Sequence, residues 1–350
     1  MDCRKYIDKL NAEKHLEHAE WVTLLSSFSE DDRSYAASLA RNIVQRVYGQ
    51  KIFIRGIVEF SNCCGNDCFY CGIRKSNRKV ERYNLSNGVI LKCCEDGFNN
   101  SIRTFVLQSG EALKLDVERL GNLIAEIKKR WPDCAVTLSL GELTLDEYEA
   151  LRNAGADRYL LRHESANEEH YRKMHPPYMS LSNRLNCLQQ LKTLGYQVGC
   201  GIMSGAPFQS AETLADDMVF MGKFQPQMVG IGPFIPHCDT PFGHYPAGTL
   251  EETLMLLSLC RIMLPEVLLP ATTALGTLQH NGRIQGILAG ANVIMPNLTP
   301  AAVQNNYNLY NNKLHTDSGV EKMLLQLHEQ LTSIGYAIAV TRGDHGEKIC

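Results

Sequence analysis

"IRTFVLQSGEALKLDVERLGNLIAEIKKRWPDCAVTLSLG", residues 102–141, begins and ends with a short apolar run. Each run is apolar on both faces of an extended chain, as buried parallel strands are, so we predict strands over 102–110 and 135–141. The segment between them carries apolar residues on one face of a helix, at Val117, Leu120, Ile124 and Ile127. A strand, a helix and a second strand in this order predict two parallel strands joined by a right-handed crossover.

The same alternation extends over residues 51–297. Six more strand-like runs are KIFIRGIVEF (51–60), RYLLRHE (158–164), QVGCGIMSG (197–205), QMVGIGPFIP (227–236), VLLPATTA (267–274) and ANVIMPN (291–297). Helix signals separate most of them, including two capping boxes, Thr144 with Glu147 and Thr249 with Glu252. Eight strands in about 250 residues match a (β/α)8 TIM-type barrel in size, so we predict an α/β fold of that kind. A doubly wound open sheet is the alternative.

The predicted barrel occupies residues 50–312 as one domain. Residues 1–49 carry apolar positions at helical spacing, which predicts an N-terminal helical extension. Residues 313–350 are expected to form a C-terminal helix and a tail packed on the barrel, with VEKMLLQLHEQLTSIGY as the amphipathic helix.

Composition and charge bear on the kind of partner, the cellular location and the state of the cysteines. The 350 residues have a net charge of −3 and no basic run, which argues against nucleic acid as the main partner. No apolar stretch is long enough for a membrane span, and the charged start lacks the apolar core of a signal peptide, so a cytoplasmic location is expected. Thiols stay reduced there, so the thirteen cysteines are expected to be core residues or metal ligands. Four of them lie in apolar runs and are predicted to be buried: Cys134, Cys187, Cys200 and Cys260.

The barrel prediction also says where the chemistry lies, because such sites form at the C-terminal ends of the strands. Polar residues gather at these strand ends, at Gln108, Ser109 and Glu111, at Glu142, at Arg162, His163 and Glu164, at Ser204, His237, Thr272, Thr273, Asn297 and Thr299. A polar side chain is costly to bury without a partner, so each is expected to face a ligand or a neighbour.

The run NCCGNDCFYC, residues 62–71, follows the first predicted strand. Cys64, Cys68 and Cys71 have C-x3-C-x2-C spacing, and Cys63 is one position out of register and is interpreted as packing. A structural zinc site normally takes four Cys or His ligands, and no second C-x2-C pair follows. Three thiolates suit an iron–sulfur cube with one open iron that binds a small chelate. A zinc site and a conventional four-cysteine cluster remain the alternatives.

With an aromatic residue before its last cysteine, this motif resembles that of the radical S-adenosylmethionine (SAM) superfamily. Further blocks resemble the HydE family of FeFe-hydrogenase maturases: VLQSGE, TLSLGE, AGADRYLLRHE, NRLNCL, MVGIGPFIPH, DTP, PATTA and GANVIMPN. Methylornithine synthase and biotin synthase share the architecture. The resemblance implies one 4Fe–4S cluster and S-adenosyl-L-methionine as cofactors, and reductive cleavage of SAM to a 5′-deoxyadenosyl radical. It also implies a role in assembling the hydrogenase H-cluster from a cysteine-ligated iron carbonyl cyanide precursor.

Site residues are carried over from the resemblance onto matching positions. The implied cluster ligands are Cys64, Cys68 and Cys71. The implied SAM contacts are Tyr70, Gln108, Ser109, Glu164, Arg184 and Met228, with Glu164 and Arg184 as a pair at the ribose or methionine end. The implied lining of the substrate cavity is Arg55, Thr137, Arg158, Arg162, Thr272, Thr273 and Tyr310, of which Arg162 and Tyr310 are also counted as catalytic.

Plainer interpretations exist for several of these residues. Glu164 could be a core carboxylate paired with Arg184 or Arg162, and Arg55 could be paired with Glu59 within its strand. Thr272 and Thr273 could be ordinary strand residues and Met228 a core residue. His163 and His237 are interpreted as structural histidines.

The expected partners are a small organometallic or amino-acid-derived substrate, other hydrogenase maturases and a low-potential electron donor. Some relatives carry a second cluster near the C-terminus, but NNKLHTDSGVEK (311–322) has no cysteine, so we expect one cluster, with Cys350 an isolated tail residue. Two other functions stay open: a radical SAM mutase or lyase acting on an amino acid, similar to methylornithine synthase or biotin synthase, and a non-enzymatic metal-binding protein.

Overall fold

The computed structural model describes residues 3–315 and 319–347, and Cys350 lies outside them. Its largest sheet has six parallel strands in sequence order. They are β2 (Gly56–Ser61), β3 (Thr104–Ser109), β4 (Ala135–Ser139), β5 (Arg158–Leu160), β6 (Gln197–Ser204) and β7 (Met228–Pro233). Strictly sequential, parallel order confirms the crossover predicted from residues 102–141.

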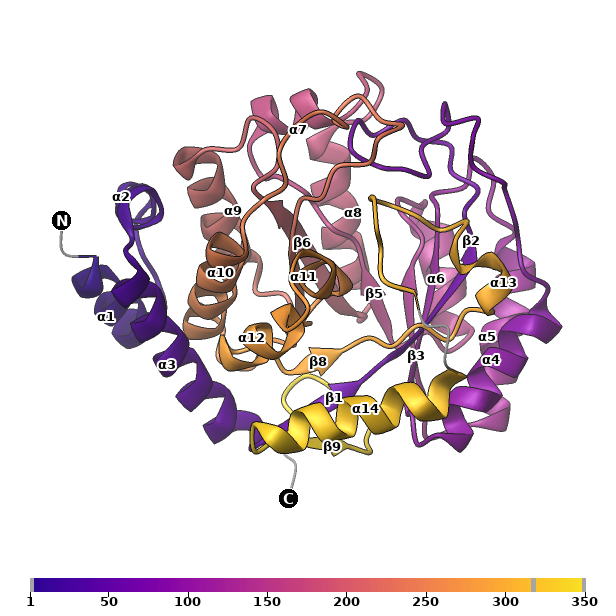
Figure 1. The fold of residues 1–350 in the computed structure, drawn as a ribbon. Coiled ribbons are helices and arrows are strands. Elements are labelled where there is room, and N and C mark those ends of the chain that lie inside the picture. Colours follow the sequence, from indigo (N-terminus) through magenta and orange to yellow (C-terminus); the bar gives the residue numbers. More distant parts are fainter. Residues whose placement is uncertain (1–2, 316–318, 348–350) are drawn as a thin grey trace.

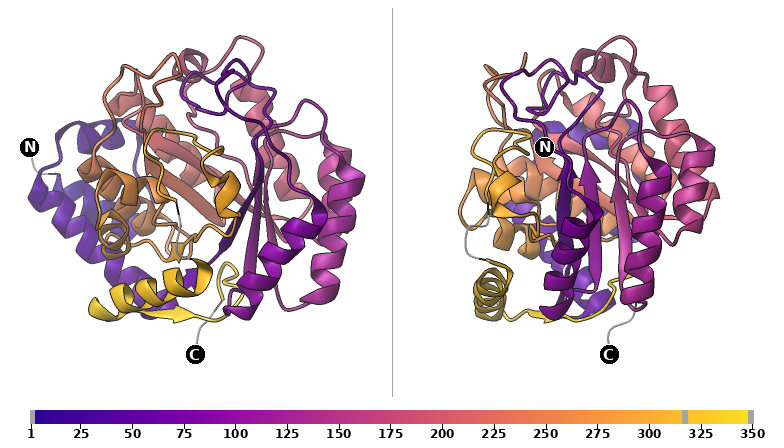
Figure 2. Two further views of the ribbon diagram at one scale, coloured as in Figure 1. Left: turned by 45° about the vertical axis from the view of Figure 1, so that its right-hand side comes forward. Right: turned by 90° about the vertical axis from the view of Figure 1, so that its right-hand side faces the viewer.

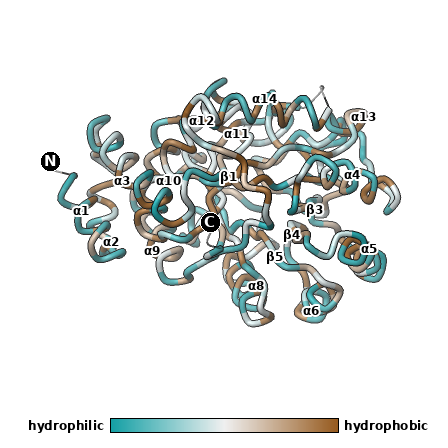
Figure 3. The backbone as a smooth tube through the Cα atoms, turned by 90° about the horizontal axis from the view of Figure 1, so that it is seen from below, coloured by the Kyte–Doolittle hydropathy of each residue, from teal (hydrophilic) through white to brown (hydrophobic). Residues whose placement is uncertain are grey.

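The sheet closes into a ring through a few short pairings. Met228 of β7 forms a bridge with Leu268, and Pro270 forms one with Val293. Val293 belongs to β8 (Val293–Ile294), which pairs with β1 (Lys51–Ile54), the segment directly before β2. Figure 3, seen from below, shows the helices surrounding the strands. The (β/α)8 barrel is therefore confirmed, and the open-sheet alternative is wrong.

Two predicted strands differ from the structure. The run 51–60 is broken at Arg55 into β1 and β2. The run 267–274 has only the bridges at Leu268 and Pro270, and Thr272 is the N-cap of helix α11, so the strand prediction is wrong for its second half. The N–H of Ala271 still donates to the carbonyl of Val293, at 2.9 Å, and pairing ends there because α11 begins two residues later.

Helices separate the barrel strands and cover the outside of the sheet (Figure 1). They are α4 (Asn87–Asn99), α5 (Val117–Arg130), α6 (Leu145–Asn153), α7 (Glu168–Met174), α8 (Leu181–Thr193), α9 (Ala211–Phe224), α10 (Leu250–Met263), α11 (Thr273–Leu278) and α12 (Gly282–Leu288). Helices α13 (Ala301–Gln304) and α14 (Gly319–Ser333) follow the last barrel strand. Of the predicted apolar face of α5, Leu120, Ile124 and Ile127 are buried and Val117 is partly buried. The Thr144–Glu147 capping box is present in full. Thr249 caps α10, but its reciprocal bond from Glu252 is not formed. Cys134, Cys187, Cys200 and Cys260 are buried, as predicted.

The N-terminal extension consists of α1 (Arg4–Glu13), α2 (His18–Ser27) and α3 (Glu30–Tyr48). Helix α3 packs along α10, and α2 packs against α9, so the extension lies on one flank of the barrel (Figures 1 and 2). Within the described residues, no helix combines the length and the apolar character that crossing a membrane requires.

The end of the described chain closes the lower mouth of the barrel, where the strands begin. Strand β9 (Ala337–Ala339), which the sequence did not predict, pairs in parallel with β1. The carbonyl of Arg342 then accepts hydrogen bonds from Thr104 (2.7 Å) and Arg158 (2.8 Å), and the Asp344 carboxylate lies 2.6 Å from Arg158. Helix α14 and β9 lie at this lower side in Figure 1. The candidate site must therefore be approached from the opposite end.

Candidate functional site

The cysteine run lies in the loop that connects β2 to α4, at the C-terminal ends of the strands. This loop is held by its own polar groups. The Arg82 guanidinium donates to four backbone carbonyls, those of Asn62 (2.6 Å), Ile73 (2.7 Å), Arg74 (2.7 Å) and Asn77 (3.2 Å). The N–H of Gly65 donates to the carbonyl of Glu111, at 2.7 Å, which ties the loop to the end of β3. The loop is thus ordered without any disulfide or regular helix.

Glycine lets two neighbouring segments approach the cysteines. A Cβ at Gly110 would lie 2.6 Å from the carbonyl oxygen of Cys63 and 2.9 Å from Cβ of Cys64. A Cβ at Gly72 would lie 2.1 Å from the carbonyl oxygen of Asn308. Because real Cβ atoms do not come this close, both positions require glycine for the loop to sit where it does.

Cys64, Cys68 and Cys71 are partly exposed free thiols, and they influence one another electrostatically. Burial, and then repulsion from the Cys64 thiolate, raise the pKa of Cys71 to about 12. Thiols in such surroundings become thiolates when they bind a metal, because the positive charge of the metal lowers their pKa. The three side chains are therefore suited to metal rather than to acid–base chemistry.

The number of thiol ligands on the loop discriminates between metals. Sulfur ligands lie about 3.8 Å apart around a tetrahedral zinc with Zn–S bonds of about 2.3 Å. Within residues 3–315 and 319–347, the trio of His, Cys, Asp or Glu donors whose ligand atoms all lie within 4.8 Å of one another is His237, Cys238 and Asp239. The three loop thiols do not belong to that group. A structural zinc site takes four Cys or His ligands, whereas three thiolates suit an iron–sulfur cube with one open iron.

Tyr70, between two of these cysteines, is fixed by His175. The imidazole Nδ1–H donates to the carbonyl of Tyr171 at 2.8 Å, so Nε2 is left to accept from the Tyr70 hydroxyl at 3.1 Å. Burial is the main cause that lowers the pKa of His175 to about 3, so the ring is neutral. The Tyr70 and His175 rings also meet edge to face. Tyr70 is thus held rigidly beside the cysteines.

Arg184, one of the two arginines that the plainer interpretation considers as a partner of Glu164, is bound by other carboxylates. Arg184 Nε lies 2.7 Å from Glu142, and Arg184 Nη2 lies 3.7 Å from Glu111. Burial lowers the pKa of Arg184, but Tyr171, Glu142 and Glu111 outweigh it and the net shift is upward. Glu164 instead lies 3.1 Å from Arg162, the other partner considered for it. The strand-end pattern had marked Glu111 and Glu142, but the resemblance gave neither a role.

Glu164 has a left-handed backbone, with φ of +62°. That conformation costs free energy in a residue other than glycine and is held by surrounding structure. Here the N–H of Glu164 donates to the carbonyl of Gly201 at 3.0 Å, while the N–H of Gly201 donates to His163 Nδ1 at 3.3 Å. The other nitrogen of His163 lies 3.3 Å from Asp217, and both side chains are fully buried. His163 is therefore structural, and it supports the turn that presents Glu164.

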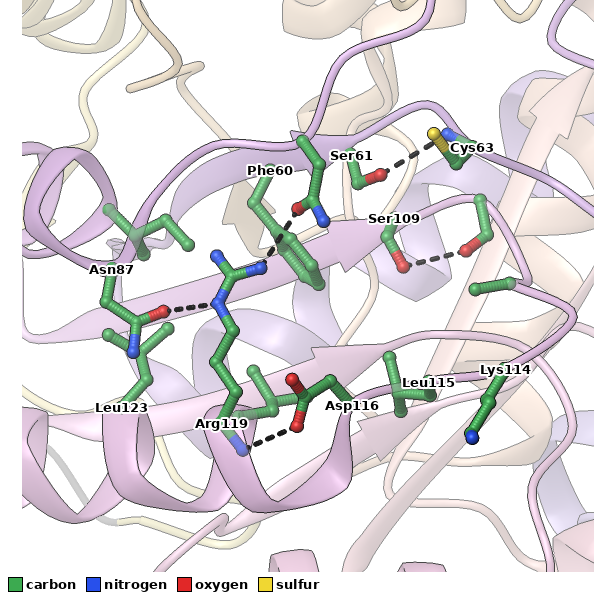
Figure 4. Close-up of a pocket in the computed structure, with 15 residues that line it drawn as sticks. Phe60, Ser61, Cys63, Asn87, Ser109, Lys114, Leu115, Asp116, Arg119 and Leu123 are labelled. Atoms are coloured by element: carbon green, nitrogen blue, oxygen red, sulfur yellow. Dashed lines mark hydrogen bonds between the residues drawn. The ribbon is translucent and has the colours of Figure 1, made fainter.

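Gln108 and Ser109, at the end of β3, have different surroundings. Gln108 donates to the hydroxyl of Tyr307 at 3.2 Å, and the Ser109 hydroxyl donates to the carbonyl of Gly110 at 2.8 Å. Ser109 and Cys63 also line a cavity of about 170 Å³ between β2, β3, α4 and α5. Figure 4 shows Cys63, Ser61 and Ser109 toward one end of this cavity, with Asn87 and Leu123 toward the other. An open groove of about 600 Å³ adjoins the loop at Gly65 and Asn66, and Glu111 and Glu142 form part of its lining.

Four implied substrate residues carry buried polar atoms without a hydrogen-bond partner in the described part of the chain. The atoms are Arg55 Nε, Thr137 Oγ1, Arg162 Nε and Thr272 Oγ1. Thr272 is an N-cap whose side chain makes no capping bond, and Thr273 is the first residue of α11. Burial raises the pKa of the nearby Tyr310 to about 12, so its hydroxyl keeps its proton. Unpaired buried polar atoms are rare in folded proteins, so these residues are available to a ligand.

Other implied residues lie at the opposite end of the strands. Arg158 is the first residue of β5 and is bound by Asp344 and by the carbonyl of Arg342. Met228 is the first residue of β7, and its sulfur lies 2.9 Å from Arg55 Nη1. Both are buried and far from the cysteines along their strands. Arg55 is not paired with Glu59, since the partners of Glu59 are Lys313 and Asn297, so that plainer interpretation is wrong.

Comparison with known proteins agrees with this geometry. The family model described as the radical SAM superfamily matches residues 58–221. The chain is 42% identical over 317 residues to the [FeFe] hydrogenase maturase subunit HydE of Thermotoga maritima, a match that covers 90% of this chain and 89% of that one. It is 24% identical to 3-methylornithine synthase of Methanosarcina acetivorans, with 84% and 83% of the two chains covered.

Solved structures share the fold. The crystal structure of methylornithine synthase (PylB) superposes with a TM-score of 0.83 at 24% identity and covers 95% of this chain and 97% of that one. The structure of the maturase HydG superposes with a TM-score of 0.81 at 19% identity, covering 97% and 76%. The extent and identity of the match to the Thermotoga protein set the chain apart from these more distant relatives. It belongs to the HydE family of FeFe-hydrogenase maturases, radical SAM enzymes that use a 4Fe–4S cluster and S-adenosyl-L-methionine.

Proposed function

We propose that this enzyme applies radical SAM chemistry to a cysteine-ligated iron carbonyl cyanide precursor of the hydrogenase H-cluster. The ligands of the cluster are Cys64, Cys68 and Cys71, which leave one iron open for the methionine end of SAM. When bound, the cluster and SAM supply a 5′-deoxyadenosyl radical. The remaining residues bind, orient and shield the reactants.

The SAM-binding residues of the proposal surround the cysteine loop. Glu142 and Glu111 hold Arg184, whose guanidinium suits the SAM carboxylate. Tyr70, fixed by His175, offers a rigid wall for the adenine, and Glu164 is presented by the turn that His163 supports. Gln108 and Ser109 complete this set at the end of β3. Met228 is retained as an implied contact, although its position favours a role in the barrel floor.

The observation that carries the substrate proposal is the set of buried polar atoms without partners. Arg162, Thr137 and Thr272 offer N–H and O–H donors, and Arg55 adds a second guanidinium. Arg162 also pairs with Glu164, and Arg55 also donates to Met228 and Gly343, so only single atoms of these side chains lack a partner. Unpaired donors favour a ligand that accepts hydrogen bonds, and cyanide and cysteine carboxylate groups are both acceptors. Tyr310, protonated and close to Arg162, is a further donor. Thr273 completes the proposed lining, and Arg158 is retained as an implied residue although Asp344 binds it at the lower mouth of the barrel.

An anaerobic reaction tests the proposal. The reconstituted enzyme, SAM and dithionite are mixed with a synthetic cysteine-ligated iron dicarbonyl cyanide, or with lysine or ornithine, and products are identified by mass spectrometry. We expect the iron complex to receive the adenosyl group at its cysteine sulfur. Rearrangement of an amino acid, with the iron complex left unchanged, would favour a mutase instead.

A matched pair of variants tests the cavity. Thr272→Val removes the partnerless hydroxyl at nearly constant shape, so we expect KM for the iron complex to rise about tenfold while SAM affinity stays unchanged. Thr193→Val, on the exposed side of α8, is the control and should change neither. Equal kinetics in Thr272→Val and the unaltered enzyme would contradict the assignment.

The proposal includes the enzyme's setting. We propose that other hydrogenase maturases supply the precursor and take up the product, that a low-potential donor supplies electrons, and that the enzyme works in the cytoplasm. Residues 50–312 are proposed as the catalytic barrel, 1–49 as its N-terminal extension and 313–350 as its C-terminal cover.

A further inference from the structure

Tyr171, in helix α7, is fully buried, yet its hydroxyl forms no regular hydrogen bond with the described residues. A buried hydroxyl without a partner costs free energy, and a phenylalanine would fill nearly the same space without that cost. Buried polar groups are nearly always paired, so each exception needs an explanation. Packing alone therefore does not explain why this position is a tyrosine.

The groups around this hydroxyl belong to the proposed SAM site. Helix α7 packs against α8, which carries Arg184. Burial is the main cause that raises the pKa of Tyr171, so the hydroxyl keeps its proton. The charge that acts on it most strongly is the Arg184 guanidinium, and the Glu142 carboxylate is next. The hydroxyl therefore lies beside the guanidinium, although the two do not form a regular hydrogen bond.

The carboxylates around Arg184 approach it along one edge only. Glu142 lies 2.7 Å from Nε and Glu111 lies 3.7 Å from Nη2, and these two nitrogens share one edge of the guanidinium. Contacts along a single edge fix the position of the group but let its plane tilt. A ligand carboxylate that accepts two N–H bonds at once requires the plane to be set as well. A further side chain packed against the guanidinium supplies that constraint.

The ring of Tyr171 is itself held in place. It stacks on the ring of His175, with centroids 4.0 Å apart and an interplanar angle of 26°. The His175 Nδ1–H donates to the carbonyl of Tyr171 at 2.8 Å, and Nε2 accepts from the Tyr70 hydroxyl at 3.1 Å. Tyr70, His175 and Tyr171 thus form a continuous row of side chains from the cysteine loop to Arg184. The row joins the part of the site proposed for adenine to the part proposed for the methionine carboxylate.

We propose that Tyr171 is a positioning residue for SAM, whose hydroxyl sets the plane of the Arg184 guanidinium that receives the methionine carboxylate. The inference rests on the proposed function, in which Arg184 and Tyr70 bind the two ends of SAM. Tyr171 acts through Arg184 rather than by contact with SAM. Loss of the hydroxyl alone keeps the stacking on His175, so it should affect the carboxylate end of SAM and not the adenine end.

A comparison of two ligands tests this role. Anaerobic equilibrium dialysis of the reconstituted holoenzyme measures the dissociation constants of SAM and of decarboxylated SAM, which lacks the carboxylate. In Tyr171→Phe we expect the constant for SAM to rise about tenfold and the constant for decarboxylated SAM to stay unchanged. KM for SAM should rise to the same extent, while kcat stays at the unaltered value. Equal weakening of both ligands, or of neither, would refute the role.

Stability separates positioning from packing. Because Tyr171→Phe removes a hydroxyl without a regular partner, the variant should resist urea at least as well as the unaltered enzyme. Tyr196→Phe is the matched control, since it removes a buried hydroxyl that donates to the carbonyl of Tyr148 at 2.7 Å. This control should unfold at a lower urea concentration and bind SAM normally. Equal losses of stability in the two variants would make the Tyr171 hydroxyl a packing group and refute the proposal.

The variant Arg184→Ala distinguishes this inference from the proposed function. In the Arg184→Ala background, adding Tyr171→Phe should weaken SAM no further, because the effects of two residues that act through one contact do not add. Unchanged SAM affinity in Arg184→Ala alone would refute the proposed SAM site, and this role with it. The expected loss in Arg184→Ala, followed by a further tenfold loss on adding Tyr171→Phe, would refute the role of Tyr171 and leave the proposed function standing.

Discussion

Arg184 and Glu142 form a close ion pair, with Nε of the guanidinium 2.7 Å from the carboxylate, and only about a tenth of the Arg184 side chain is exposed. The pair joins helix α8 to the end of β4. It holds the guanidinium at the mouth of the barrel, beside the cysteine loop. In this chain Glu142, rather than Glu164, sets the orientation of the arginine proposed to bind SAM.

Replacing this carboxylate should weaken SAM binding. Glu142→Gln leaves the buried guanidinium without its nearest counter-charge, so we expect the dissociation constant for SAM, measured by anaerobic equilibrium dialysis, to rise by about 10- to 100-fold. Iron content should not change. The exposed Glu149→Gln on α6 is the control. An unchanged SAM affinity in Glu142→Gln would show that the ion pair does not position Arg184.

The buried His175 predicts a loss of stability in mild acid. Its pKa is about 3 in the folded protein against an ordinary value of 6.5, so the unfolded chain takes up a proton first as pH falls. The contribution of His175 is fully present above pH 6.5 and is lost as pH falls toward 3. Between pH 6.5 and 5 we expect the free energy of unfolding to fall by about 2 kcal/mol on this account. His175→Gln, compared by urea unfolding at both pH values, should lack that part of the decrease; the same decrease in both proteins would argue against the assignment.

We expect Asp344, although it lies near the end of the sequence, to contribute strongly to the free energy of unfolding. It is the carboxylate partner of Arg158, whose side chain is fully buried, and it also accepts from Gln197 at 2.8 Å. Asp344→Asn leaves the buried guanidinium uncompensated, and we expect a loss of about 3 kcal/mol in urea unfolding. Asp133→Asn, an exposed change, should cost little. If the two variants were equally stable, the lower mouth of the barrel would not depend on this pair.

Arg184→Ala tests whether binding of the cluster and binding of SAM depend on different residues. Since Arg184 is not a cluster ligand in the proposal, the variant should reconstitute with the same iron content and yet bind SAM at least about tenfold more weakly. The comparison is made on the same reconstituted samples, by iron analysis and by dialysis. A variant that lost its iron would assign Arg184 to the support of the cluster loop instead.

Much of this architecture could be predicted from local pattern. The strand–helix alternation, the buried face of α5 and the C-x3-C-x2-C spacing are all encoded within short stretches, where periodicity and ligand spacing have direct physical meaning. Strand ends also marked Glu111 and Glu142 as polar residues near the site. Local pattern failed at 267–274, where pairing ends after Ala271 and Thr272 is the N-cap of a helix.

Relationships between distant segments could not be predicted. The partners of Arg158 lie almost two hundred residues later, at Arg342 and Asp344, and a three-residue strand such as β9 has too little pattern of its own. The choice of Glu142 over Glu164 as the partner of Arg184 depends on where α8 sits relative to β4. Arg82 gave no signal in the sequence, although its guanidinium binds four carbonyls of the cysteine loop.

The most direct test of the central claim is the metal content of the anaerobically reconstituted protein, followed by the electron paramagnetic resonance spectrum of its reduced form with and without SAM. Three thiol ligands and an open iron predict about four irons and four sulfides per chain, a spectrum that changes when SAM is added, and loss of both in Cys68→Ala. A protein that takes up one zinc, or whose iron spectrum is the same with and without SAM, would contradict the account.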